Sequence, residues 1–279
     1  GEYSWSVVIA SLVLAFCVAA VLIGGVKRIA SVSQVIVPFM AVIYIVFVLV
    51  LVVCNITAVP AAFATIVKAA FSPRAITGAV GSFLVAMQKG VARGIFSNEA
   101  GLGSAPIAAA AAQTKEPVRQ GLVSMTGTFI DTIVICTLTG LSIVLTGAWQ
   151  VDGLEGVQVT TYAFQNGLPF PKELSAFVLM LCLVFFAFTT ILGWDYYSER
   201  CLEYLSGGRM KYVKVYRWIY ILAVFIGPYM TVSAVWTIAD IFNGLMALPN
   251  MIALFALSGV VVKETKHFFE RHKNGEIED

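Results

Sequence analysis

A polar interruption divides an otherwise apolar stretch of the sequence between residues 77 and 112. Residues 90–106 read Gly-Val-Ala-Arg-Gly-Ile-Phe-Ser-Asn-Glu-Ala-Gly-Leu-Gly-Ser-Ala-Pro. The glycines and the proline disfavour a continuous helix, and unwinding frees backbone carbonyl and amide groups for ligands. Carbonyl and hydroxyl oxygens suit a hard cation, and the N–H groups at a helix start attract a carboxylate. The pattern is typical of a transporter site for a carboxylate and a sodium ion.

The interruption has a second interpretation as a cytoplasmic loop, in which Arg93 and Glu99 are simply solvated. That interpretation adds one membrane span and inverts the sidedness of every later basic loop. A discontinuous helix near residues 94–103 is therefore favoured. Glu99 keeps two interpretations: a functional carboxylate within the membrane, or a partner of Arg93 or of a helix start.

A second polar pair, Thr189 and Thr190, lies in a later apolar stretch. Adjacent hydroxyl groups point to neighbouring faces of a helix, so one can ligate sodium while the other faces a cavity. The residues alone favour a simpler interpretation, in which the hydroxyls bond the preceding turn or a neighbouring helix. Further along, Asp195, Glu199 and Arg200 fit a gate or an interfacial ion pair equally well.

Asp131 is an acidic residue deep inside another apolar stretch, and Thr132 follows it directly. Ser124 and Thr128 recur with it at helical spacing and define one polar face. We expect its partners to be polar groups of the broken helix, including Arg93, and a sodium ion; a proton-handling role is the weaker alternative. Asp240 interrupts the last apolar stretch in a similar way, as part of a gate or as an ion pair within the bundle.

The elements that position these residues are predicted to be membrane-spanning helices. Hydrophobic residues make up 59% of the chain and charged residues 12%, against about 25% charged residues in ordinary soluble domains. The apolar runs have the length of a transmembrane helix and lack the alternation of a barrel strand. We expect an all-α integral membrane protein with about seven spans, at residues 4–24, 33–53, 77–112, 118–146, 173–200, 213–230 and 232–262. Residues 60–71 are too short to span and are expected to form a half-helix.

The distribution of basic residues predicts the orientation of the chain. Lysine and arginine concentrate in alternate loops, which places those loops in the cytoplasm. This puts Gly1 outside, residues 1–262 in one transmembrane bundle of the plasma (inner) membrane, and residues 263–279 in a cytoplasmic tail. The net charge of +2 is spread through loops and does not indicate a nucleic-acid partner.

The sequence argues against an enzyme. An intramembrane serine hydrolase needs a serine and a base such as histidine, and Ser104 superficially suggests one. Both histidines, His267 and His272, lie in the predicted cytoplasmic tail. A channel filter would be a short loop repeated around an oligomer, whereas here the polar residues are distributed over several different helices of one chain.

Residues 94–106 closely resemble the signature of the alanine/glycine:cation symporter family. The resemblance continues through residues 24–30, 37–41 and 189–199, so it covers nearly the whole chain. It implies symport of alanine or glycine with sodium, by alternating access, in a LeuT-type fold of two inverted repeats. Family members carry about four further N-terminal helices, which we expect as partners within the same protein. A receptor or channel-like protein without coupled transport is the alternative.

The resemblance also implies roles for individual residues. Phe96 and Trp194 would be walls of the amino-acid site, and the carbonyl of Phe186 would be a sodium ligand. The implied substrate-binding residues are Gly94, Phe96, Ser97, Asn98, Gly101, Thr190 and Trp194. The implied sodium ligands are Phe186, Thr189, Thr190, Asn98, Thr128 and Asp131.

Overall fold

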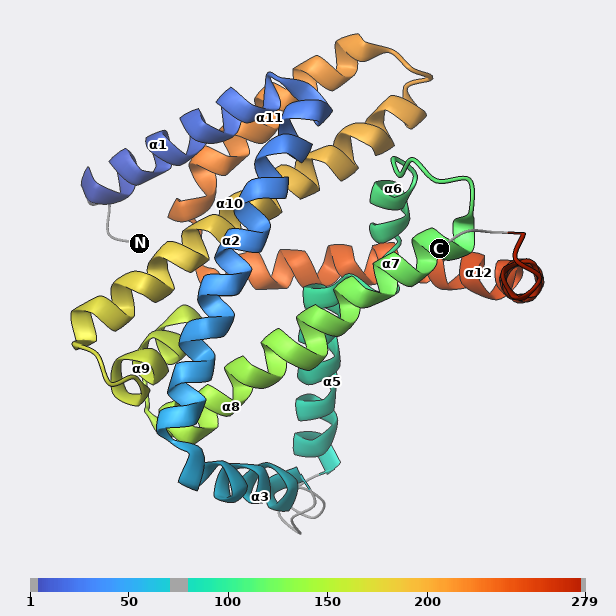
Figure 1. Ribbon diagram of the computed structural model, residues 1–279. Helices are drawn as coiled ribbons and strands as arrows, with labels where there is room; N and C mark the ends of the chain where they lie inside the picture. Colours follow the sequence, from blue (N-terminus) through green and yellow to red (C-terminus); the bar gives the residue numbers. More distant parts are fainter. Residues whose placement is uncertain (1–4, 71–79, 277–279) are drawn as a thin grey trace. The chain divides into compact units, whose positions relative to one another are not determined.

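The computed structural model describes residues 5–70 and 80–276, apart from the side chains of residues 80–83 and 86. Every regular element within those ranges is a helix, as the sequence predicts (Figure 1). Some predicted features lie outside the described residues: Gly1, the starts of the first and third spans at residues 4 and 77, the end of the half-helix at residue 71, and the last three residues of the tail.

Five helical stretches are long and apolar enough to cross a membrane. They are α1 (Trp5–Leu22), α2 (Gly25–Cys54), the consecutive helices α7 (Pro117–Phe129), η2 (Ile130–Cys136) and α8 (Thr137–Leu145), then α10 (Lys172–Leu205) and α12 (Val232–Lys273). These stretches support a helical membrane protein. The predicted third and sixth spans fall on helices outside these five, namely α5 (Val80–Asn98), α6 (Ala105–Ala109) and α11 (Met210–Ile226).

The remaining helices are short. They are η1 (Ile56–Ala58), α3 (Val59–Ala70), η3 (Ala148–Gln150), α9 (Val157–Gly167) and η4 (Gly227–Tyr229). Helix α3 has 12 residues and matches the predicted half-helix at residues 60–71. Helix α9 was not predicted, because its stretch carries polar residues within a long loop.

The chain divides into two compact units. The first unit contains residues 1–80 and 135–231, and the second contains residues 81–134 and 232–279. In the first unit, α10 packs against α2, α9 and α11 (Figure 1). In the second unit, α12 and α6 both contact α7.

One apolar core of the first unit, between α2, α9 and α10, is built on one face of α2. Tyr44, Val48 and Leu51 are buried at the three- and four-residue spacing of a helix face. They pack against Phe164 of α9 and Leu179 of α10. This packing explains why α9 is ordered beside the spans although its sequence is not apolar throughout.

Two polar contacts fix this core. The hydroxyl groups of Tyr44 and Thr139 are 2.6 Å apart. The side-chain amide of Asn55 donates to the carbonyls of Leu51 and Gly167, at 2.8 and 2.9 Å. Asn55 therefore satisfies a carbonyl at the end of α2 and ties that end to the end of α9.

A second apolar cluster joins the other helices of the first unit. Leu22 of α1, Ile29 of α2 and Leu192 of α10 are buried together, and Tyr220 of α11 packs against them. Helix α1 contacts both α10 and α11. The polar stretch of α10 that follows Leu192 therefore begins inside a well-packed part of the unit.

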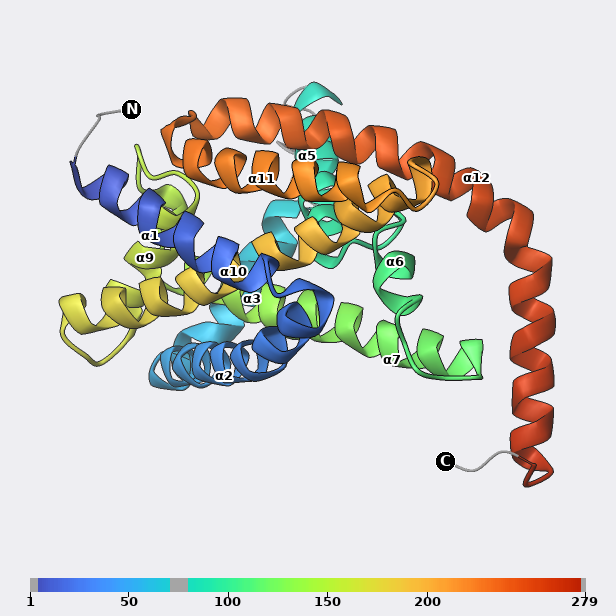
Figure 2. The same ribbon diagram turned by 90° about the horizontal axis from the view of Figure 1, so that it is seen from above.

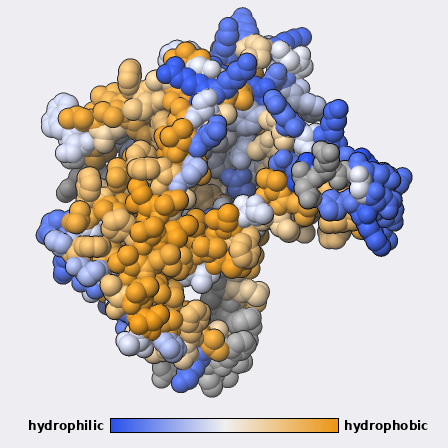
Figure 3. All heavy atoms as spheres, in the orientation of Figure 1, coloured by the Kyte–Doolittle hydropathy of each residue, from blue (hydrophilic) through white to orange (hydrophobic). Residues whose placement is uncertain are grey.

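The exposed surface fits a lipid environment. Figure 3 shows apolar side chains over α2 and hydrophilic side chains over the C-terminal turns of α12. On α2, Val35, Phe39 and Val42 are 71%, 54% and 60% exposed, which would be costly in water. Helix α12 is continuous for 42 residues (Figure 2), so helical structure extends into the predicted tail that begins at residue 263.

Candidate functional site

The predicted break in the polar stretch is present in the second unit. Helix α5 ends at Asn98, and α6 begins at Ala105. Glu99, Gly101 and Gly103 have positive φ angles of 55°, 88° and 84°. Glycine adopts this left-handed conformation without strain, whereas Glu99 requires local interactions to hold it there.

Side chains hold the break in shape. The side-chain oxygen of Asn98 accepts a hydrogen bond from the backbone N–H of Ala100, at 2.9 Å. The buried hydroxyl of Ser104 donates to the carboxylate of Glu99, at 2.7 Å. From α12, the amide of Asn250 donates to the carbonyl of Gly101, at 2.9 Å. The contact between Glu99 and Ser104 therefore links the two ends of the break.

The break starts later than the sequence indicated. We expected the helix to be discontinuous near residues 94–103, but Gly94, Phe96, Ser97 and Asn98 lie in the last turns of α5. A single glycine is tolerated within a helix at a cost of about 1 kcal/mol, so Gly94 does not end it. The helix ends where two closely spaced glycines adopt positive φ.

Ser97 and Asn98 meet the segment that contains Asp131. The hydroxyl of Ser97 lies 3.0 and 2.8 Å from the two carboxylate oxygens of Asp131. The amide of Asn98 donates to the hydroxyl of Thr132, at 3.0 Å. These contacts confirm the expectation that Asp131 has partners on the broken helix. Thr128 lies one turn before Asp131 and is half-buried.

The backbone around Asp131 is itself unusual. Residues 130–136 form the π-helix η2 between α7 and α8. Such π segments are rare and occur frequently at functional sites, because they change the facing of the side chains that follow. Asp131 and Thr132 are the second and third residues of this segment. The π-helix therefore sets the direction in which both side chains leave the helix.

Arg93 has a different partner from those expected. Its guanidinium makes a bidentate ion pair with Asp240 of α12, at 2.9 and 3.0 Å. It also lies 3.8 Å from the ring centroid of Trp236, which contacts the ring of Phe96 edge-on at 5.2 Å. The interpretation that pairs Arg93 with Glu99 or Asp131 is wrong, because α12 presents a carboxylate and an aromatic face together. Asp240 thus forms an ion pair within the second unit.

The threonine pair lies in the first unit, in α10. The hydroxyl of Thr189 is 2.9 and 3.1 Å from the carbonyls of Phe185 and Phe186, one turn earlier. This is the simpler interpretation drawn from the sequence, a hydroxyl that bonds its own helix. Thr190 is exposed, and Trp194 contacts Tyr197 edge-on at 5.7 Å.

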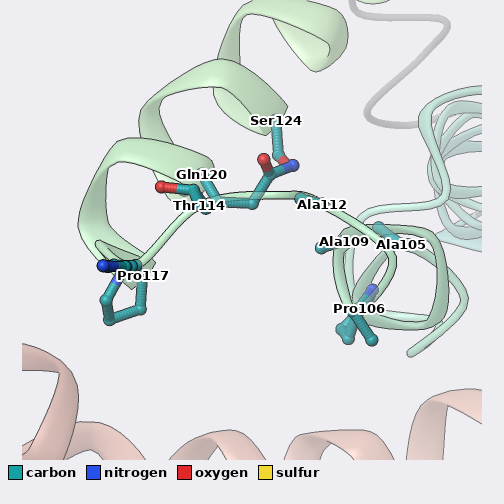
Figure 4. A pocket seen from close by; sticks show the side chains of 11 residues that line it. Ala105, Pro106, Ala109, Ala112, Thr114, Pro117, Gln120 and Ser124 are labelled. Atoms are coloured by element: carbon teal, nitrogen blue, oxygen red, sulfur yellow. The ribbon is translucent and has the colours of Figure 1, made fainter.

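Two cavities lie near the break within the second unit. The first, of about 510 Å³, lies between α6 and α7, with Ala105 and Ala109 on one side and Gln120 and Ser124 on the other (Figure 4). The second, of about 250 Å³, lies between α5 and α12. Neither is lined by a residue that the sequence proposed for substrate or sodium, so the side-chain contacts define the candidate site.

Sequence reasoning missed three participants in this site. Thr132 was noticed only as a neighbour of Asp131, and the π-helix that carries both has no sequence signal that we recognise. Trp236 lies four residues before Asp240, a spacing that puts both on one helix face and therefore within reach of one arginine. Asn250 follows Pro249, and a polar residue beside a proline within an apolar run was an available signal.

Comparison with known proteins identifies the family. The model of the "Sodium:alanine symporter family" matches residues 1–279. An uncharacterized transporter of Haemophilus influenzae is 54% identical over 269 residues, which cover 96% of this chain and 58% of the relative. The sodium/alanine symporter AgcS of Methanococcus maripaludis is 49% identical over 269 residues, 95% of this chain and 58% of the relative.

A more distant relative agrees with these two. The amino-acid carrier protein AlsT of Bacillus subtilis is 37% identical over 276 residues, which cover 99% of this chain and 57% of the relative. The chain thus spans 57–58% of the length of these relatives. Because the family model matches the chain throughout, the chain belongs to the sodium:alanine symporter family, a family of transporters and not of enzymes.

Proposed function

We propose that the full-length protein is a sodium-coupled symporter of small neutral amino acids, alanine or glycine. Membership of the family and the likeness to AgcS support this proposal. The observation that carries it is the pair of contacts between Ser97 and the carboxylate of Asp131. They hold an acidic group beside the C-terminal end of α5, which itself carries negative partial charge. Such a pairing is favourable when a cation binds between them.

The proposed sodium ligands are hard oxygen donors, as a hard cation requires. In the second unit they are the carboxylate of Asp131, the side-chain oxygen of Asn98 and the hydroxyl of Thr128. In the first unit they are the carbonyl of Phe186 with the hydroxyls of Thr189 and Thr190. Sodium at the second set would compete for the Thr189 hydroxyl, which now bonds its own helix.

The proposed amino-acid site uses small residues and two aromatic walls. Gly94 and Gly101 leave room for a ligand to approach the backbone, since a Cβ added to either meets nothing within 4 Å. Phe96 and Trp194 would limit the length of the substrate side chain. Ser97, Asn98 and Thr190 would supply its polar contacts. This set favours alanine or glycine over larger amino acids.

Transport would proceed by alternating access in a LeuT-type fold with about seven spans in this part of the protein. Sodium would order the break at residues 99–104, and α5 with α6 would then move with the N-terminal helices against the remaining scaffold. Gly1 would lie outside and residues 263–279 in the cytoplasm of a plasma (inner) membrane protein.

The test is alanine and glycine uptake by the full-length protein in proteoliposomes, with and without an inward sodium gradient. Uptake that follows the gradient supports symport. Binding of alanine without gradient-driven uptake would support a receptor, and uptake indifferent to sodium would support a channel-like protein. Substitutions Asn98→Ala, Thr189→Ala and Thr190→Ala should each weaken sodium-dependent uptake, and full activity in all three would overturn the site.

A further inference from the structure

Asp195 is a buried carboxyl group that the proposed site does not use. It lies in α10 of the first unit and is 0% exposed. Neither of its carboxylate oxygens has a hydrogen-bond partner. An ionised carboxylate without partners is strongly disfavoured in a low-dielectric interior, by far more than a typical hydrogen bond can offset.

The nearest charges leave Asp195 uncompensated. Glu199 lies one turn later on the same helix face and is 1% exposed. Arg217 of α11 makes a bidentate ion pair with Glu199, with contacts of 2.6 and 2.9 Å. Two ionised carboxylates beside one guanidinium would leave a net charge of −1 inside the unit. A single proton on Asp195 brings the net charge of Asp195, Glu199 and Arg217 together to zero.

The other groups on the surrounding helices do not supply the missing charge. On α11, Tyr216 and Tyr220 are phenols that stay neutral near pH 7, and Tyr220 donates to the carbonyl of Ile191, at 2.8 Å. Helix α1 carries no acidic or basic residue between Trp5 and Leu22. Arg200 pairs with Glu203 at 2.6 Å. The other basic residues on the helices that pack around Asp195 are all exposed: Lys172 of α10, Lys211 and Lys214 of α11, and Lys27 and Arg28 of α2.

A metal cation does not fit this position. Sodium and other hard cations need a shell of several oxygen ligands. The carboxylate oxygens of Asp195 have no polar partner, and Glu199 is already engaged by Arg217. A proton needs no such shell, because it binds covalently to one carboxylate oxygen.

We propose that Asp195 is a proton-binding site. Its carboxyl group takes a proton from water and holds it, while Glu199 stays ionised and paired with Arg217. Loss of the proton would place a second negative charge beside Glu199, so it requires water to enter or Arg217 to move. Occupancy of the site is therefore linked to the packing of α10 against α11. This inference concerns the folded protein and does not depend on the proposed symport.

The test is infrared spectroscopy of the full-length protein in liposomes near neutral pH. Protonated carboxyl groups show a C=O stretch that is separate from the bands of ionised carboxylates, and it shifts in D₂O. We expect the unsubstituted protein to show this band. Asp195→Asn should remove one carboxyl equivalent from it, whereas Glu203→Gln should leave it intact. A spectrum of Asp195→Asn identical to that of the parent overturns the proposal.

A second variant keeps the test decisive if Asp195→Asn does not fold. In Glu199→Gln, Arg217 loses its carboxylate, and the charge balance then favours an ionised Asp195. The band should again lose one equivalent, although Asp195 is still present. Retention of the full band in Glu199→Gln would overturn the part of the proposal in which an ionised Glu199, paired with Arg217, keeps the proton on Asp195. Neither outcome requires transport, so failure of the symport proposal would be seen separately.

Discussion

Each of the two units has an acidic residue within an apolar helix, but the two residues differ in their burial and in their hydrogen bonding. Asp131 in the second unit is half-buried, and its carboxylate accepts a hydrogen bond from the hydroxyl of Ser97 on α5. Asp195 in the first unit is fully enclosed and has no hydrogen-bond partner. Both helices belong to stretches that are apolar enough to cross a membrane.

The difference fits the two roles proposed for these residues: Asp131 would belong to a site that exchanges a cation, and Asp195 would hold a proton. An exchangeable cation site needs accessible oxygen donors and a backbone that can adjust, and the π-helix and the break at residues 99–104 are consistent with such a site. A buried carboxyl within a well-packed core resists exchange, because each change of charge must be compensated locally. Substitutions in the two units should therefore affect different measurements.

The largest expected effect is that of substituting Asp131 on the sodium dependence of transport. Asp131→Asn keeps the shape and the contact with Ser97 but removes the negative charge that attracts a cation. We expect the sodium concentration for half-maximal alanine uptake to rise by at least on the order of 10- to 100-fold, because loss of an outer-shell partner of a metal ligand alone has an effect of that size. Asp152→Asn, in an exposed loop, is the control and should behave like the parent. Unchanged sodium dependence in Asp131→Asn would remove the second unit from the ion site.

The next largest effect is that of substituting Arg217 on the free energy of unfolding. Arg217→Met leaves the buried Glu199 without its cation, and breaking a buried ion pair on one side costs about 3–5 kcal/mol. Arg200→Met is the matched control, because the Arg200–Glu203 pair has side chains about one-third exposed, and exposed pairs contribute about 0–1 kcal/mol. Thermal unfolding of the full-length protein in detergent measures both. Equal losses in the two variants would contradict the view that burial makes Glu199 depend on Arg217.

The fold was predictable where the sequence carries long apolar runs. Helix α1 begins and ends close to its predicted span, α10 begins close to its predicted start, and α2 ends close to its predicted end, because twenty apolar residues in succession leave few alternatives to a transmembrane helix. Helix α2 begins eight residues earlier than predicted, at Gly25. Helix α9 escaped prediction because its order depends on Phe164, which is buried against Tyr44 of a helix more than a hundred residues earlier in the chain. No local pattern encodes such a contact.

The sequence identified several residues of the candidate site but did not predict their contacts or where α5 ends. The sequence located the break and drew attention to Ser97, Asn98 and Asp131, since polar residues inside a membrane span are costly without a role. It did not show that α5 continues to Asn98, because helix ends depend on φ angles at Glu99 and the glycines that follow. It also misassigned Arg93, whose choice between carboxylates depends on the register of α12.

A pair of glycine substitutions tests where the break begins. Gly103 has a φ of 84°, and an added Cβ would lie 3.2 Å from Asn250, so Gly103→Ala should cost about 1–2 kcal/mol. Gly94 lies inside α5 with nothing within 4 Å of an added Cβ, so Gly94→Ala should stabilise by up to about 1 kcal/mol. Thermal unfolding distinguishes the two signs. Destabilisation by Gly94→Ala would instead favour unwinding from residue 94.

The smallest effect concerns the polar tie within the first unit. Thr139 donates its hydroxyl proton to the carbonyl of Ile135, at 2.7 Å, so Tyr44 is the donor in the 2.6 Å contact between the two hydroxyls. Tyr44→Phe removes that donor and keeps the aromatic packing against Phe164, at a cost of about 0.5–1.5 kcal/mol. Thr139→Val and the double variant complete a cycle that isolates the hydrogen bond. A coupling energy well above this range would mean that polar contacts, and not apolar packing alone, hold α2 against α8. The first unit would then resemble the second in depending on hydrogen bonds between helices.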